Sequence, residues 1–92
     1  MKTITKKVLP KYFQAIVEGK KHYELRLNDF DISEGDTLRL EEYDEQRNPT
    51  GRFLEKSVSY VAKFKIQELF WPQEEIMEKG IQIISFLWKN IF

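Results

Sequence analysis

The sequence contains no cysteine and only one histidine, His22. The lack of cysteine excludes disulfides, thiolate metal sites and cysteine nucleophiles, and a single histidine excludes a His-rich metal site. No stretch approaches the roughly 20 apolar residues that a membrane helix needs, and Lys6 and Lys7 stand where a secretory signal needs its apolar stretch. We therefore expect an unprocessed, soluble, cytoplasmic protein with no metal, no other cofactor and no membrane partner.

The chain also lacks an excess of charge of one sign, since its 15 Lys and Arg residues equal in number its 15 Asp and Glu residues. Net charge thus gives no argument for a polyanionic partner. The distribution is uneven, because residues 1–26 hold seven basic and two acidic side chains. A basic face that attracts phosphate and an ordinary solvated surface explain this asymmetry equally well.

The hydrophobic pattern indicates one small domain over residues 1–92, a length that supports a single core. Alternating or continuous apolar runs predict about five strands, at residues 4–9, 22–27, 37–43, 53–64 and 81–88. Helical spacing predicts two short helices, at residues 10–18 and 73–79. Short strands, a hairpin turn at residues 44–51 and brief helices favour a small α+β fold of the β-barrel type over a doubly wound sheet, which needs longer helices.

Glycine and proline mark the ends of the predicted helices. Pro10 suits a first helical position because its missing N–H has no partner there. Gly19 and Gly80 stand where a left-handed residue ends each helix, and Pro72 confines the second helix to the residues after it.

Residues 22–27 alternate between apolar and polar side chains. Glu24 and Arg26 share the polar face, near enough for the guanidinium to hold the carboxylate. Lys21 falls on the other face of this strand by alternation. It can join Glu24 and Arg26 only if it sits where the strand begins, just after Gly19. The ordinary interpretation of such a pattern is an ion pair on a solvated face, with Lys21 as a cation at the end of the preceding helix.

A longer pattern runs through the segment GKKHYELR at residues 19–26, in which Gly19, Lys21, Glu24 and Arg26 form Gly-x-Lys-x-x-Glu-x-Arg. This pattern resembles the signature of the ASCH family. The Pro-x-x-Phe-x-x-Ile helix before it and the Gly-Asp-x-Leu-x-Leu strand after it are similar to an uncharacterised bacterial and phage subgroup. The resemblance covers about residues 8–61. It departs at residues 4–7, where relatives often carry His-x-Leu-Lys, and residues 68–78 match no family motif.

The resemblance implies a PUA-like barrel whose cleft, between the first helix and the sheet, gathers Lys21, Glu24 and Arg26, with Gly19 and Asn28 beside them. Arginine grips phosphate or a base edge with its planar fork, and lysine meets phosphate as a point charge. The full signature favours a ligand role over a solvated ion pair. We therefore predict a monomer that binds RNA or a modified nucleotide.

Two other functions stay open. Some ASCH-like proteins are amidohydrolases of acetylated cytidine that use a Lys, a Thr and a Glu, and others are described as ribonucleases. Glu24 stands where those amidohydrolases carry the Thr nucleophile, and a carboxylate does not replace a hydroxyl in acyl transfer. A Lys21 and Glu24 pair is still able to perform general acid–base catalysis on a nucleotide.

Aromatic residues give the other alternative. Tyr12, Tyr23 and Tyr43, together with the pair Phe70 and Trp71, are candidates for stacking on bases, although core packing is the usual role of aromatics in so small a domain. The Phe70 and Trp71 pair precedes Pro72 in an irregular segment. Together with the tail residues Ile91 and Phe92, it predicts a surface for a protein partner.

Overall fold

The computed structural model describes residues 1–86. The chain divides into two compact units, the first formed by residues 1–61 and the second beginning at residue 62. Residues 81–86 form no strand, in contrast to the prediction for residues 81–88. The end of that predicted strand and the tail residues Ile91 and Phe92 lie outside the described residues.

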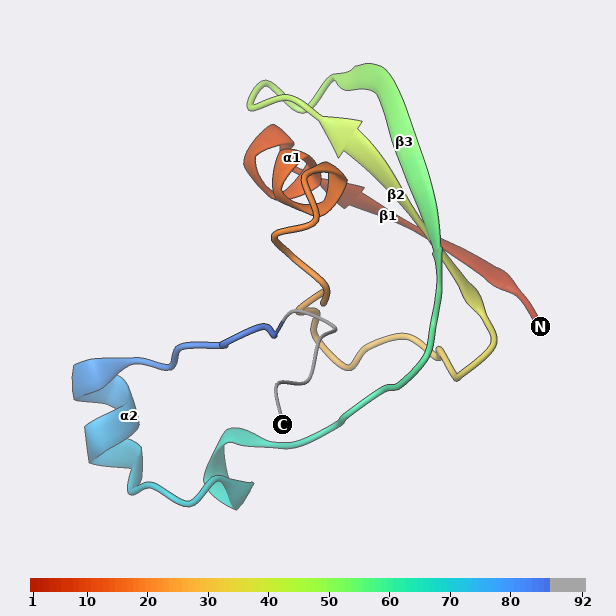
Figure 1. Cartoon of the computed structure of the whole chain (residues 1–92). Coiled ribbons are helices and arrows are strands. Elements are labelled where there is room, and N and C mark those ends of the chain that lie inside the picture. The colour runs from red at the N-terminus through yellow and green to blue at the C-terminus, as the bar shows by residue number, and fades with distance from the viewer. Residues whose placement is uncertain (87–92) are drawn as a thin grey trace, which may run out of the picture. The chain divides into compact units, whose positions relative to one another are not determined.

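The first unit is built on a sheet of three strands in the order β1-β2-β3 (Figure 1). The strands are β1 (Thr3–Val8), β2 (Thr37–Tyr43) and β3 (Pro49–Ser57). β1 pairs with β2 in parallel, and β2 pairs with β3 as an antiparallel hairpin. The predicted bounds of β2 and the hairpin are confirmed. β3 begins earlier than predicted and ends at Ser57, well before residue 64.

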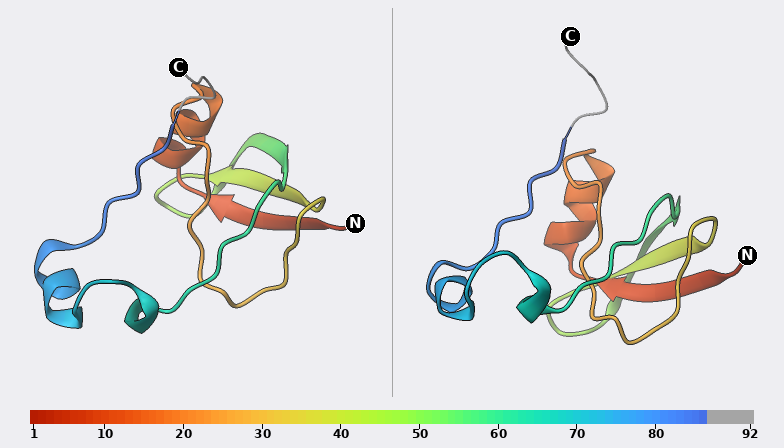
Figure 2. Two further views of the ribbon diagram at one scale, coloured as in Figure 1. Left: turned by 60° about the horizontal axis from the view of Figure 1, so that its bottom comes forward. Right: turned by 90° about the horizontal axis from the view of Figure 1, so that it is seen from below.

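Helix α1 (Pro10–Val17) lies against one face of this sheet (Figures 1 and 2). Pro10 occupies its first turn as predicted, and the residue before it is extended. Because parallel strands need a crossover connection, α1 and the loop after it carry the chain from β1 to β2. The helix buries Phe13 and Ile16 against Val8 and Leu40, and these four residues form the core.

The turn before β2 is held by a buried carboxylate. Asp36 accepts hydrogen bonds from the backbone N–H groups of Ser33, at 2.9 Å, and Lys2, at 3.1 Å. These bonds hold the pKa of Asp36 below its ordinary value of 3.8, and the bond from Ser33 lowers it most. Gly35 adopts a φ of 90°, which the turn requires. The Gly-Asp motif therefore connects the start of β1 to the start of β2 through hydrogen bonds.

The predicted five-stranded barrel is wrong. Within the described part of the chain the only sheet is open and mixed, because β1 and β3 each pair with β2 alone. Residues 22–27 were expected to supply a strand, but they are irregular. Alternation makes a strand possible, whereas a strand forms only where a partner offers a ladder of backbone hydrogen bonds. Barrel closure needs such a partner at every edge.

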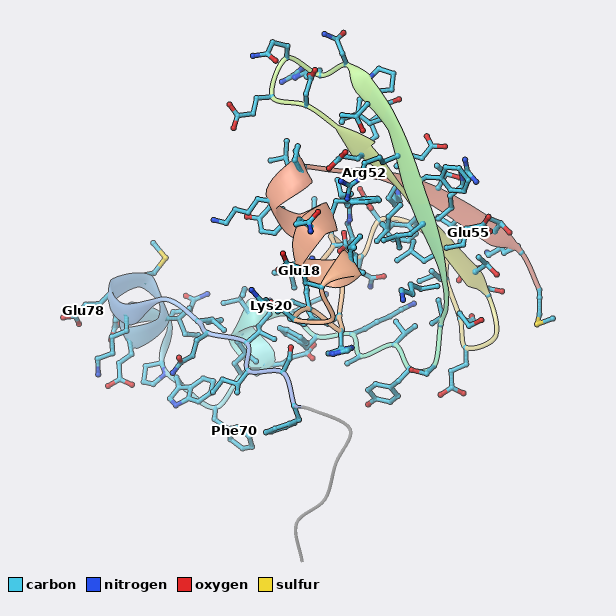
Figure 3. All side chains as sticks on the ribbon, turned by 45° about the horizontal axis from the view of Figure 1, so that its top comes forward. Glu18, Lys20, Arg52, Glu55, Phe70 and Glu78 are labelled. Carbon is cyan, nitrogen blue, oxygen red and sulfur yellow. The ribbon has the colours of Figure 1, made fainter. Side chains whose placement is uncertain are left out.

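The second unit contains the short 3-10 helix η1 (Ile66–Glu68) and helix α2 (Gln73–Lys79). The bounds of α2 are those predicted, and Gly80 follows it with a φ of 73°. Neither helix contains a buried residue. The rings of Phe70 and Trp71 meet edge to face, with centroids 6.5 Å apart, and Phe70 is 98% exposed (Figure 3).

Candidate functional site

The end of α1 determines where the predicted site begins. Gly19 has a φ of 75°, its N–H donates to the carbonyl of Ile16 at 3.0 Å, and the N–H of Lys20 donates to the carbonyl of Ala15 at 2.9 Å. These two bonds are those of a Schellman motif, in which a left-handed glycine reverses the chain at a helix end. The N–H of Lys21 also donates to Ala15, at 3.1 Å, so Lys21 is fixed directly at the end of the helix.

The ammonium group of Lys21 has both an acidic and an aromatic environment. Its Nζ donates to Oε1 of Glu24 at 2.8 Å. The same nitrogen lies 5.1 Å from the ring centre of Tyr12 and 5.3 Å from that of Tyr23. Both distances are within the range of a cation–π interaction. Lys21 is thus held by one carboxylate and two rings.

Arg26 binds the other oxygen of the same carboxylate. Its Nε and its Nη2 each lie 2.8 Å from Oε2 of Glu24. Nη2 also donates to the backbone carbonyl of Lys7 at 2.6 Å, which ties the loop to the end of β1. Glu24 therefore stands between two cations, each on its own carboxylate oxygen, and we call these three residues the Lys21–Glu24–Arg26 cluster.

Two members of this cluster, Lys21 and Glu24, are largely removed from water, whereas Arg26 stays partly exposed. The side chains of Lys21 and Glu24 are each 13% exposed, and that of Arg26 is 30% exposed. The cluster carries one net positive charge, and withdrawing charges from water costs free energy that ion pairing only partly returns. An anionic group placed beside it meets two preorganised cations.

The structure brings together three of the five predicted ligand residues. Gly19 positions the chain, and a Cβ added to it would meet no atom within 4 Å, so this position has open space around it and no contact role. Asn28 is exposed in the loop beyond the cluster, and among residues 1–86 its side chain has no hydrogen bond. His22 is also exposed. The predicted conflict between the faces of Lys21 and Glu24 does not arise, because residues 21–26 do not form a strand.

A hollow of about 340 Å³ lies beyond the far end of β1. Its lining is formed by three consecutive residues at the end of β1 and by the β2–β3 turn: Lys7, Val8, Leu9, Tyr43, Asp44 and Arg47. The three residues of the cluster do not line it. The sequence indicated Tyr43 as a stacking candidate and placed Lys7 in the basic segment at residues 1–26. Arg47 was not predicted, because no motif marks it.

The fold also buries a polar group on β2. Glu42 is only 6% exposed. It accepts a hydrogen bond from Thr50 at 2.6 Å and lies 3.6 Å from Nε of Arg52. Arg52 reaches from β3 towards α1, over the ring of Phe13 at 4.5 Å (Figure 3). This group joins β2, β3 and α1 and is explained by the fold alone.

A model of a known protein family matches most of the chain. Residues 5–71 match the model described as "Domain of unknown function (DUF3850)". The chain belongs to this DUF3850 family. The matched range includes the Lys21–Glu24–Arg26 cluster and the hollow, and it ends before α2. Searches of curated proteins and of solved structures find no match to this member of the family.

Across residues 1–86, none of the helices combines the length and the apolar character that a membrane span requires.

Proposed function

We propose that this DUF3850 protein binds RNA or a modified nucleotide at the Lys21–Glu24–Arg26 cluster. The observation that supports the proposal is the convergence of the cluster: both cations of the ASCH-like pattern contact the one carboxylate of that pattern, at 2.8 Å each. Residues two and three positions apart are within reach of one another along the chain, and Arg26 in addition contacts the distant carbonyl of Lys7 at 2.6 Å, which fixes the cluster beside β1. We also propose that the resemblance to the ASCH family reflects a shared site.

Each member of the cluster has a chemical role in this proposal. Arg26 presents its planar fork to a phosphate or to a base edge, and Lys21 supplies a charge to phosphate. Glu24 orients both cations, because each of its oxygens contacts one of them. Tyr12 and Tyr23, which already contact Lys21, offer faces on which a base stacks.

The partial burial of Lys21 and Glu24 favours this role over that of a surface ion pair. Exposed ion pairs form readily because water continues to solvate both charges, although they contribute little to stability. Here Lys21 and Glu24 are mostly withdrawn from water, and a buried ion pair is often no more stabilising than apolar residues of the same volume. A polar cluster in such a place is better explained by a ligand than by stability.

The hydrolase alternative gains no support from the geometry. A general base needs a lone pair that faces the substrate, and a general acid needs a transferable proton. The ammonium of Lys21 donates to Glu24, and Arg26 occupies the other oxygen of the same carboxylate. The pair is therefore arranged as two fixed charges, which suits binding.

The proposal is tested by RNA binding and by one substitution. We expect a short single-stranded oligouridylate to bind wild-type protein with an affinity that falls as salt rises from about 50 to 200 mM. Arg26→Ala should weaken binding roughly tenfold or more, as expected for loss of about 1–3 kcal/mol of contact energy. Fluorescence anisotropy measures both effects.

The matched control is Arg39→Ala. Arg39 is paired with Glu41 at 2.9 Å and Glu55 at 3.4 Å on the opposite face of the sheet from α1, so this substitution removes the same charge from a different surface. Equal affinities for Arg26→Ala and Arg39→Ala, or no RNA binding at low salt, would remove the basis of the proposal.

A further inference from the structure

The hollow at the end of β1 combines a mainly apolar wall with two cationic residues. Two cationic residues, Lys7 and Arg47, share its lining with Tyr43 and with the apolar residues Val8, at the end of β1, and Leu9, just after it. We propose that this hollow binds the nucleotide next to the one held by the Lys21–Glu24–Arg26 cluster, so that the protein recognises at least a dinucleotide. This inference rests on the proposed function and extends it to a second subsite.

The backbone of Arg47 is the first argument. Arg47 has a φ of 67°, and it is the only residue other than glycine in the described part of the chain with a positive φ. Left-handed backbone is strained for residues with a Cβ and is adopted routinely by glycine and asparagine. The turn itself gains nothing from arginine at this position, because its hydrogen bond from Arg47 N–H to the carbonyl of Asp44 uses backbone atoms alone. Strained residues of this kind gather at ligand sites.

The side chains around the hollow supply the second argument. Nζ of Lys7 lies 4.7 Å from the ring centre of Tyr43, so a cation and an aromatic face are already side by side. Asp44 is the one acidic residue of the lining, and its Oδ1 is occupied by the N–H groups of Gln46, at 3.0 Å, and Asn48, at 2.9 Å. The wall of the hollow is therefore mainly apolar and aromatic, which suits a base, and Lys7 and Arg47 give the lining residues a positive balance that suits the phosphate attached to it.

Lys7 connects the hollow to the cluster. Its side chain lines the hollow, while its backbone carbonyl accepts the 2.6 Å hydrogen bond from Nη2 of Arg26. One residue thus contributes to both sites, its side chain to the hollow and its backbone carbonyl to the cluster. A strand of nucleic acid that contacts Arg26 with one phosphate continues past Lys7 towards Arg47 with the next.

Arg47→Gly separates binding from folding. Glycine adopts the left-handed conformation without strain, so we expect the midpoint of thermal unfolding to be equal to or above that of wild type. Affinity for a short oligouridylate should fall roughly tenfold, and the slope of log affinity against log salt should decrease by about 1, as expected for one lost phosphate contact. Arg47→Lys keeps the charge and should keep that slope.

The ligand series distinguishes this inference from the proposed function. Uridine monophosphate fits the cluster alone, so Arg47→Gly should leave its affinity unchanged while Arg26→Ala weakens it. If Arg47→Gly binds the oligouridylate as tightly as wild type while Arg26→Ala binds it weakly, the second subsite is refuted and the proposed function stands. If neither substitution alters oligouridylate binding, both are refuted.

Discussion

At the scale of single residues, the bonding partners of Asp36 and Glu42 differ from those of the candidate ligand residue Glu24. Asp36 accepts two backbone N–H groups at the start of the sheet, and Glu42 is held by Thr50 and Arg52. Glu24 instead contacts only side-chain cations. The first two are explained by the fold, whereas Glu24 is joined to groups that are themselves suited to a ligand.

The backbone hydrogen bonds of Asp36 lead to a pH-dependent stability. Because they lower its pKa in the folded protein, the carboxylate stabilises the fold above its unfolded pKa of about 3.9, and this contribution is lost as pH falls through the lower folded pKa. We expect the free energy of unfolding to decrease below about pH 4. Urea titrations at several pH values should show a shallower decrease in Asp36→Asn than in wild type.

The control for this measurement is Asp29→Asn, which removes an exposed carboxylate from the preceding loop and leaves both backbone hydrogen bonds intact. Its acid profile should follow that of wild type. Parallel profiles for wild type and Asp36→Asn would show that Asp36 does not carry the effect.

At the scale of elements, the sequence was sufficient where the determining signal is local. Pro10 and Gly19 bracket α1, Gly80 ends α2, and alternation gives β2, because each signal acts within a few residues of the element that it bounds. The strand expected at residues 22–27 failed because strand formation depends on a distant partner. The convergence at Lys21 follows from the helix end, so the motif was visible in the sequence while the loop geometry that assembles it was not.

The end of α1 gives the prediction at this scale. Gly19→Ala places a Cβ on a backbone with a φ of 75°, where no neighbouring atom lies within 4 Å, so the cost is conformational and not steric crowding by another residue. We expect a loss of roughly 1–2 kcal/mol in the free energy of unfolding. Chemical denaturation monitored by circular dichroism measures it.

Gly19→Asn is the comparison that isolates the cause. Asparagine tolerates left-handed backbone better than alanine does, so it should retain more stability than Gly19→Ala. A larger loss with asparagine than with alanine would mean that the Schellman geometry is not what Gly19 provides.

At the scale of the molecule, the first unit depends on very few buried side chains. Its core consists of Val8, Phe13, Ile16 and Leu40, with Leu38 and Leu54 packed against it. A chain with so small a core has little stability in excess, since domains of this size bury a smaller fraction of their surface than larger ones. Leu25 and Leu27, on the apolar face of the strand expected at residues 22–27, are exposed and add nothing to this core.

Two leucines of this unit provide a matched test of that dependence. Leu40 is 2% exposed, at the centre of the sheet, and Leu25 is 66% exposed, in the loop after α1. Leu40→Ala removes buried methyl groups and leaves a cavity, so we expect it to cost about 2–5 kcal/mol, whereas Leu25→Ala should change stability by about 0.5 kcal/mol or less. Urea unfolding compares the three proteins directly. Because the same atoms are deleted in both variants, similar losses would show that Leu25 is also buried in solution and that the core extends into residues 22–27.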